Sequence, residues 1–243
     1  MKHKDHYNDA YILDLSSKIQ CVMPGFDKEN FSHKLIGRLD DKELYARLDC
    51  IVDAMEESMD GTYYENIQAF FNMLGPELTQ AEGILNIGWW LWPIGKYVER
   101  NGNNNWKLSL SFIKELTKRF TGEYAIRTIL KEHPREVMDE LIIWTYDKNI
   151  QVRRLASEGV RIRLPWAKKL LVALEEFERY TAILTNLKDD PEKYVQKSVG
   201  NNLNDLFKHS PEKARYIIAQ WEKSEKPSKA QEWIIKHGMR NQK

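Results

Sequence analysis

The chain has 243 residues, of which 42% are hydrophobic and 30% are charged, a balance that excludes a disordered protein. No apolar run approaches the roughly 20 residues of a membrane-spanning helix, so we expect a soluble protein. The polar segment from Met1 to His6 leads directly into a helical pattern, which argues against a signal peptide and favours the cytoplasm. Cys21 and Cys50 have no partner at CxxC spacing, so we expect two small core residues and neither a zinc site nor a disulfide.

Charge is distributed unevenly along the chain. Residues 147–243 carry 20 Lys and Arg against 13 Asp and Glu, a net charge of +7, whereas residues 1–146 carry 17 against 23, a net charge of −6. This asymmetry predicts a polyanionic partner for the C-terminal part. Solvated helix faces that happen to be rich in lysine are the alternative.

Helical signals dominate the chain. Prolines stand where helices are expected to begin, at His133-Pro134, Leu164-Pro165, Asp190-Pro191 and Ser210-Pro211. Apolar residues then follow at helical spacing, and no segment alternates as a strand does. The sequence therefore predicts an all-α fold.

A repeat is visible in the second half of the chain. Residues 147–154 are echoed by residues 190–197, which places Val152 and Val195 43 residues apart, and a weaker third copy places Trp233 38 residues further on. Such periods are typical of α-solenoids made of HEAT-like helix pairs, in which one helix of each pair lines a concave surface. We expect one repeat domain over residues 1–243, with capping helices in 1–60 and the strongest repeats and the active site in 120–243.

Basic pairs recur at equivalent positions of these repeats, at Arg153/Arg154, Gln196/Lys197 and Lys236/His237. Lys and Arg at such intervals could follow DNA phosphates along a basic concave groove. Alternatively, each Arg packs between repeats and pairs with an acidic loop residue such as Asp147.

Three segments contain residues suited to chemistry. Arg154, Glu158 and Arg161 fall on one helical face, which places an ionised carboxylate between two guanidinium groups. Further along, we expect Pro165 to start another helix and the Trp166 indole to face a cleft. Thr121 is a candidate N-cap with Glu123 in the first turn of its helix. Residues 198–205 hold three asparagines and Asp205 in mid-helix, which predicts an interrupted helix. Ordinary ion pairs and core aromatics are the alternatives.

The string from Arg153 to Gly159, followed by Arg161-x-Arg163-Leu164-Pro165-Trp166-Ala167, resembles the signature of HEAT-like-repeat DNA alkylation repair enzymes, most closely the AlkC branch of the AlkC/AlkD superfamily. Residues 120–127, 194–205 and 233–240 resemble the flanking blocks of that family in the expected order, and residues 90–98 extend the similarity weakly.

The resemblance implies a monofunctional DNA glycosylase that excises cationic bases of the 3-methyladenine type from double-stranded DNA as a monomer, without a metal or cofactor. Glu158 would be the principal carboxylate, Glu123 and Asp205 the accompanying acids, and Trp166 the aromatic wall. The matching blocks and the basic pairs give these expected DNA-binding residues: Arg127, Arg154, Arg161, Arg163, Lys197, Asn201, Asn202, Lys236, His237 and Arg240.

Two other functions fit the same sequence. A non-catalytic binder of branched or damaged DNA would need the basic surface but not the converging carboxylates, and a HEAT-type protein-interaction scaffold would need neither. Convergence of Glu123, Glu158 and Asp205 in space separates these alternatives.

Overall fold

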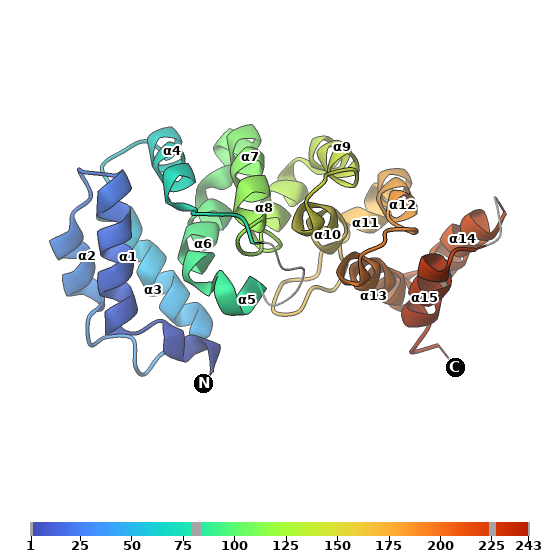
Figure 1. Ribbon diagram of the computed structural model, residues 1–243, viewed down its shortest axis with the longest axis horizontal. Helices are drawn as coiled ribbons and strands as arrows, with labels where there is room; N and C mark the ends of the chain where they lie inside the picture. The colour runs from blue at the N-terminus through green and yellow to red at the C-terminus, as the bar shows by residue number, and fades with distance from the viewer. Residues whose placement is uncertain (1, 79–83, 224–226, 243) are drawn as a thin grey trace. The chain divides into compact units, whose positions relative to one another are not determined.

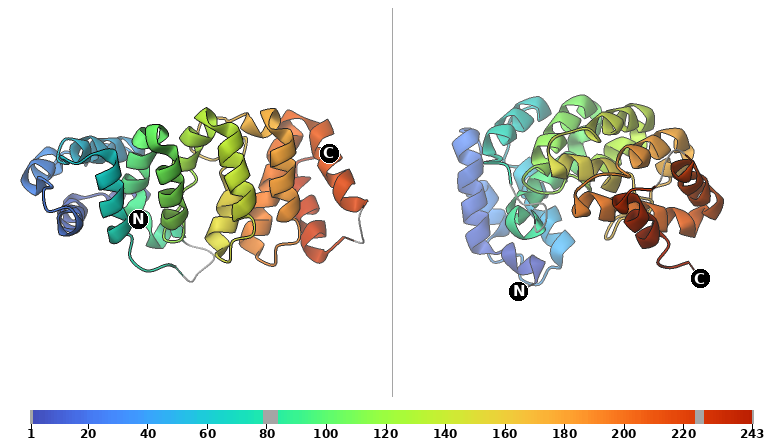
Figure 2. Two further views of the ribbon diagram at one scale, coloured as in Figure 1. Left: turned by 90° about the horizontal axis from the view of Figure 1, so that it is seen from above. Right: turned by 45° about the vertical axis from the view of Figure 1, so that its right-hand side comes forward.

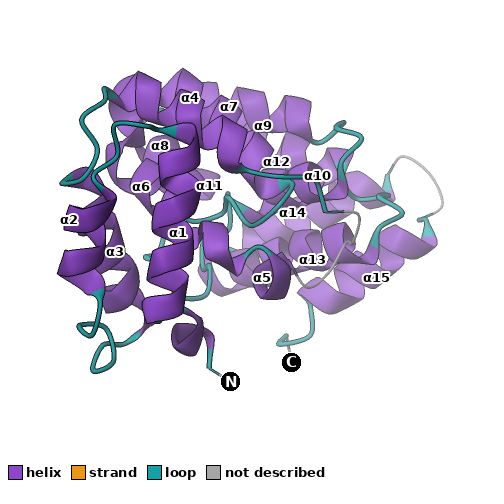
Figure 3. Ribbon diagram, turned by 60° about the vertical axis from the view of Figure 1, so that its left-hand side comes forward, coloured by secondary structure: helices purple, strands orange, loops and turns teal. Residues whose placement is uncertain are grey.

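A computed structural model describes residues 2–78, 84–223 and 227–242. The described residues form helices and loops and no β-strand (Figure 3). They divide into two compact units, one of residues 2–78 and 84–121 and one of residues 122–223 and 227–242. Among the helices that the structure describes, none is long and apolar enough to cross a membrane.

In the first unit α1 packs against α2 and α4, and α3 packs against α2 and α6. Its helices are α1 (Asp9–Val22), α2 (Lys28–Leu35), α3 (Leu44–Glu56), α4 (Tyr63–Met73), α5 (Ile84–Ile87), α6 (Trp92–Asn101) and α7 (Trp106–Thr117), with 3-10 helices η1 (His3–His6), η2 (Trp89–Leu91) and η3 (Gly102–Asn105). Cys21 is exposed and Cys50 half-buried, so the prediction of two core cysteines is wrong.

The second unit is a stack of helices in two layers (Figures 1 and 2). One layer contains α9, α12 and α14, and the other contains α10, α13 and α15. The helices are α8 (Ala125–Glu132), α9 (Pro134–Trp144), α10 (Ile150–Glu158), α11 (Val172–Glu175), α12 (Phe177–Asn186), α13 (Lys193–His209), α14 (Pro211–Glu222) and α15 (Lys229–Gly238). The repeated positions Val152 and Val195 lie on α10 and α13 and are fully buried, as the 43-residue spacing requires.

Helix starts in this unit follow the sequence signals in most places. Pro134 and Pro211 are the first residues of their helices, and the side chain of Asn149 accepts hydrogen bonds from the first turn of α10. Asp190 accepts the Glu192 amide proton at 2.9 Å, just ahead of α13. The Asn149 side chain therefore caps the start of α10.

Three local predictions are wrong. No helix starts at Pro165, because residues 159–171 form a loop between α10 and α11. Helix α8 begins at Ala125, so Thr121 is not its N-cap and Glu123 precedes its first turn. Helix α13 runs through residues 198–205 without a break.

Candidate active site

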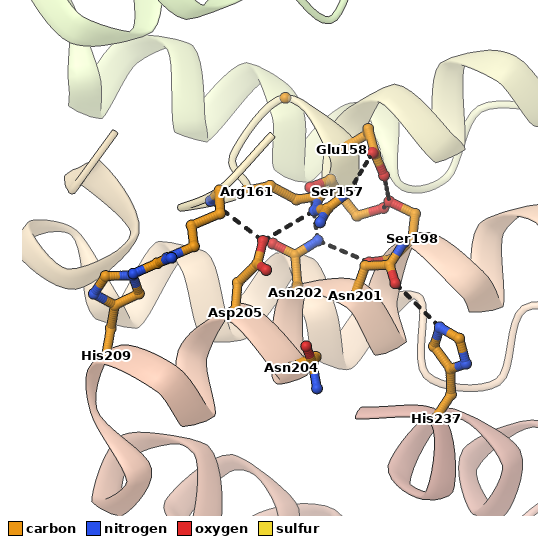
Figure 4. A network of polar contacts seen from close by, with 12 residues as sticks. Ser157, Glu158, Arg161, Ser198, Asn201, Asn202, Asn204, Asp205, His209 and His237 are labelled. Atoms are coloured by element: carbon orange, nitrogen blue, oxygen red, sulfur yellow. Dashed lines mark hydrogen bonds and ion pairs between the residues drawn. The ribbon is translucent and has the colours of Figure 1, made fainter. Parts of the chain in front are cut away.

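Three carboxylates are joined by two guanidinium groups in the second unit. Arg154 Nη1 lies 2.6 Å from Glu123 Oε2, and Arg154 Nη2 lies 3.3 Å from Glu158 Oε1. Arg161 Nη1 lies 2.8 Å from the same Glu158 oxygen, and Arg161 Nε lies 3.0 Å from Asp205 Oδ2 (Figure 4). The acids come from the start of α8, the end of α10 and the middle of α13. The structure therefore brings the three carboxylates together.

Glu158 is held on both of its carboxylate oxygens. Oε1 accepts from Arg161 and pairs with Arg154, and Oε2 accepts the Ser198 hydroxyl proton at 2.7 Å. Burial by itself would raise the pKa of Glu158, but Arg154, Arg161 and the Ser198 hydroxyl together lower it below its ordinary value of 4.5. Glu158 is thus ionised at neutral pH, as its place between two guanidinium groups predicts.

Asp205 is held on one oxygen only. Its Oδ2 accepts from Arg161 Nε at 3.0 Å and from the backbone N–H of Arg163 at 3.2 Å. Its Oδ1 accepts no hydrogen bond from any described residue, although the residue as a whole is only 4% exposed. The carboxylate of Asp205 therefore keeps lone pairs available for water or a ligand.

The polar side chains of α13 explain why this helix continues. Asn202 donates to the carbonyls of Ser157 and Ser198 at 2.9 and 3.0 Å and accepts from Tyr180, and it is fully buried. Asn204 donates to the carbonyl of Gly238 at 2.9 Å. Because each amide bonds to a neighbouring helix, tertiary contacts outweigh the low helix propensity of asparagine.

Residues 99–241 match the family of DNA alkylation repair enzymes. The chain belongs to this family. It is 32% identical over 240 residues to the uncharacterized protein YhaZ of Bacillus subtilis (strain 168), an alignment that covers 98% of the chain and 63% of YhaZ. It also resembles the structure of Pseudomonas fluorescens alkylpurine DNA glycosylase AlkC bound to DNA containing an abasic site analog, with a TM-score of 0.85, 27% identity, and coverage of 99% of this chain and 64% of that one.

The chain thus spans less than two thirds of the length of these two relatives. The match to AlkC confirms the predicted all-α fold of HEAT-like helix pairs. The family match confirms that the signature from Arg153 to Ala167 identifies a DNA alkylation repair enzyme. The basic concave groove stays a prediction.

Several expected DNA-binding residues are buried and bonded within the protein. Arg127 donates to the carbonyls of Gly159, Arg161 and Lys168 at 3.2, 2.7 and 2.7 Å, and burial, followed by the nearby Arg161, lowers its pKa to about 10. Arg154 and Arg161 form ion pairs with the carboxylates, and Asn202 is fully buried and inaccessible to DNA. These side chains organise the site from inside the protein.

The remaining expected DNA-binding residues lie at the surface. Lys197, Lys236, Arg240 and Arg163 are exposed. Asn201 and His237 are half-buried and bonded to each other at 3.1 Å, and Arg240 also donates to Asn201. Arg153 packs between repeats, which was the alternative to phosphate binding. It pairs with Asp190 at 2.6 Å and donates to the carbonyl of Asp147.

Trp166 and two further residues complete the surroundings. Trp166 is 60% exposed in the loop between α10 and α11, so its place in an aromatic wall stays a prediction. Sequence reasoning missed Ser198, which holds Glu158, and Tyr194, whose ring lies 5.0 Å from the Arg154 guanidinium carbon. The 43-residue repeat contained a signal for Tyr194, because residues 190–197 align with the Arg154 segment.

Proposed function

We propose that this DNA alkylation repair enzyme is a monofunctional glycosylase that hydrolyses the N-glycosidic bond of cationic N-alkylated bases, of the 3-methyladenine type, in double-stranded DNA. The observation that carries the proposal is the convergence of Glu123, Glu158 and Asp205, which a purely DNA-binding or scaffold protein does not require. The resemblance to AlkC, which is named an alkylpurine DNA glycosylase, supports the same reaction.

The chemistry of the lesion suits this cluster. An N-alkylated purine is already positively charged and leaves readily, so the barrier lies mainly in the oxocarbenium-like sugar and the attack of water. A fixed carboxylate stabilises that developing positive charge and can accept a proton from the attacking water. The proposal needs no metal and no cofactor.

The hydrogen bonds support different roles for the two central acids. Asp205 has a free oxygen, Oδ1, which suits the group that meets the sugar or the water. Glu158 has both oxygens occupied and fixes Arg161, which in turn orients Asp205. We therefore propose Asp205 as the carboxylate that contacts the reacting atoms, with Glu158 as its main support, whereas the resemblance to the family favoured Glu158.

Surface cations would supply the affinity for DNA. Lys197, Lys236 and Arg240 lie on or just after α13 and α15, which belong to one layer, and Arg163 lies in the loop beside Asp205. Contacts of this kind bind phosphates without reading sequence and weaken steeply with salt. We propose that the protein acts as a monomer in the cytoplasm, where damaged DNA is present.

Asp205→Asn tests the reaction directly. The substitution keeps the shape and an acceptor for Arg161 but removes the charge, so release of methylated bases from alkylated duplex should fall by about 10²-fold or more. Asp190→Asn is the matched control, since Asp190 is a buried aspartate that pairs with Arg153 in the same unit. The control should lose similar thermal stability and keep its excision rate.

Two outcomes would contradict the proposal. If Asp205→Asn excises at the parent's rate, Asp205 does not contact the reacting atoms. If the parent releases no base from any alkylated substrate yet binds junctions or abasic-site duplexes tightly, the protein is a binder of damaged DNA and not a glycosylase.

A further inference from the structure

A hydrogen-bonded pair of Arg163 and His209 lies beside the candidate active site. Arg163 Nε donates to His209 Nε2 at 2.8 Å, so this ring nitrogen is an acceptor and the imidazole is neutral. Arg154 and Arg161 pair with carboxylates instead, which balance their charge. The charge of the exposed Arg163 guanidinium is not balanced by an ion pair with any described carboxylate.

Two lysines add to this positive charge. Lys169 comes from the same loop as Arg163, and Lys208 directly precedes His209 on α13. Both lysines are exposed, and neither pairs with a carboxylate of a described residue. The His209 cluster is this set of four residues: Arg163, Lys169, Lys208 and His209.

The charges that act on the His209 ring come from the loop and from α13. Partial burial, followed by Lys169 and Arg163, lowers the pKa of His209 below its ordinary value of 6.5, and Lys208 acts in the same direction. Asp205 opposes them, but its charge is already paired with Arg161. The described residues of α10, α14 and α15 form no hydrogen bond or ion pair with the ring. The imidazole is therefore kept neutral by cations that lack a counter-ion.

The His209 cluster adjoins the carboxylate that we propose to contact the reacting atoms. His209 follows Asp205 by four residues on α13, so the two side chains lie on the same face of the helix (Figure 4). The backbone N–H of Arg163 donates to Asp205 Oδ2 at 3.2 Å, which fixes the loop to the same carboxylate. Because every sugar within a DNA strand carries phosphates on both sides, a sugar at Asp205 would bring a phosphate close to the cluster.

We propose that the His209 cluster binds a phosphodiester of the DNA strand, and that His209 takes up a proton when it does so. The phosphate accepts from the Arg163 guanidinium, which turns away from the imidazole, and from the new N–H at His209 Nε2. The proton comes from solution and returns there when the DNA leaves. The inference rests on the proposed function and adds a proton to its binding step.

The bound phosphate reverses the balance of charge at His209. It compensates the cations that oppose protonation, so His209 holds its proton more tightly in the complex than in the free protein. Since the complex then binds more protons than the free protein, affinity for DNA rises as the pH falls, by up to about 10-fold per pH unit. Phosphate contacts made by Lys and Arg alone would not change in this range, because both stay charged.

His209→Gln separates the proton from the rest of the site. Glutamine keeps an acceptor for Arg163 but takes up no proton near neutral pH. The assay is the dissociation constant for a duplex containing an abasic-site analogue, measured at constant salt between about pH 8 and about pH 6. The parent should bind about 10-fold more tightly at the lower pH, whereas His209→Gln should bind equally at both and match the parent at the higher pH.

His237→Gln is the matched control. His237 is also a half-buried histidine on the expected DNA-binding surface, and nearby cations lower its pKa as well, after burial. Its Nε2 bonds to Asn201 at 3.1 Å, and no arginine donates to it among the described residues. This variant should keep the pH dependence of the parent.

Calorimetry of binding in two buffers with different ionisation enthalpies counts the protons directly. The parent and His237→Gln should take up as much as one proton per complex near pH 6.5, and His209→Gln should take up none. A purely structural His209 would lower the melting temperature of His209→Gln and leave its proton uptake at the parent's value.

The outcomes separate this inference from the proposed function. Proton uptake that is absent from the parent, that persists in His209→Gln or that disappears in His237→Gln would overturn the phosphate site alone. A parent that takes up the proton through His209 yet excises no base from alkylated DNA would overturn the glycosylase and leave the phosphate site standing. A parent that binds no duplex would overturn both.

Discussion

Glu158→Gln tests whether the acid–guanidinium chain stabilises the second unit. The side chain of Glu158 is 6% exposed, and its Oε1 is shared by Arg154 and Arg161. Glutamine retains the shape and one acceptor, and its amide can donate to the Ser198 hydroxyl. The substitution therefore removes charge with little change in packing.

The expected loss follows from what each arginine keeps. Removing one partner of a buried ion pair costs about 3 to 5 kcal/mol when the other charge is left unpaired. Here Arg154 keeps Glu123 at 2.6 Å and Arg161 keeps Asp205 at 3.0 Å. The loss should thus approach that of a single hydrogen bond to a charged group, about 1.5 to 3 kcal/mol, or a fall in Tm of roughly 3 to 12 °C.

Thermal unfolding across pH measures this loss. Because the folded-state pKa of Glu158 lies below 4.5, its ionised form stabilises the protein above that pH, and the stabilisation is lost as pH falls through the folded value. The gap in Tm between parent and variant should be full at pH 7 and close on acidification below about pH 4.5. Asp139→Asn, which breaks an exposed pair with Arg179, should cost less than about 1 kcal/mol. Equal Tm values at pH 7, or a gap that widens on acidification below about pH 4.5, would refute the reasoning.

Two further substitutions probe the support of the site. Ser198→Ala removes the hydroxyl that helps to lower the pKa of Glu158. The stability of this variant should therefore start to fall at a higher pH than the stability of the parent when both are acidified. If Tm depends on pH in the same way in both proteins, the Ser198 hydroxyl does not lower the pKa of Glu158. Gly200→Ala places a Cβ 2.8 Å from the His237 ring and 3.2 Å from the Ile234 carbonyl oxygen, so thermal unfolding should show a loss of about 1 to 3 kcal/mol. Gly95→Ala, which meets only the Leu116 side chain at 3.3 Å, should be tolerated, and equal losses in the two variants would contradict the packing argument.

The sequence was sufficient to predict α10 and α13 and the 43-residue alignment between them. The repeated positions Val152 and Val195 are apolar because they are buried between layers. The spacing of the repeat therefore indicates which residues of successive helices face the core. Short-range spacing placed Glu158 between two guanidinium groups, since Arg154 is four residues before it on α10 and Arg161 is three residues after it in the loop that follows. Local contacts of this kind can be read from one segment.

Contacts between repeats could not be predicted in this way. Arg127 seemed suited to phosphates, but its partners are three carbonyls that come together only when residues 159–168 fold over α8. The asparagines of residues 198–205 suggested a broken helix because helix propensity is local, whereas their amides bond to Ser157 and Gly238 on other segments. A buried Arg or Asn is identified by partners that are remote in sequence.

The difference between Glu158 and Asp205 also comes from the contrast between contacts within one segment and contacts between repeats. The resemblance to the alkylation repair family ranks Glu158 first, and its flanking arginines lie close to it in sequence. The folded chain satisfies both oxygens of Glu158 and leaves one oxygen of Asp205 without a partner among the described residues. Glu158 accepts from three protein donors and Asp205 from two, both on a single oxygen, so Asp205 has more acceptor capacity left for water. The residue with the strongest local motif is therefore the one whose two oxygens both accept from protein donors, whereas the acid contributed by the next repeat keeps one oxygen without a partner among the described residues.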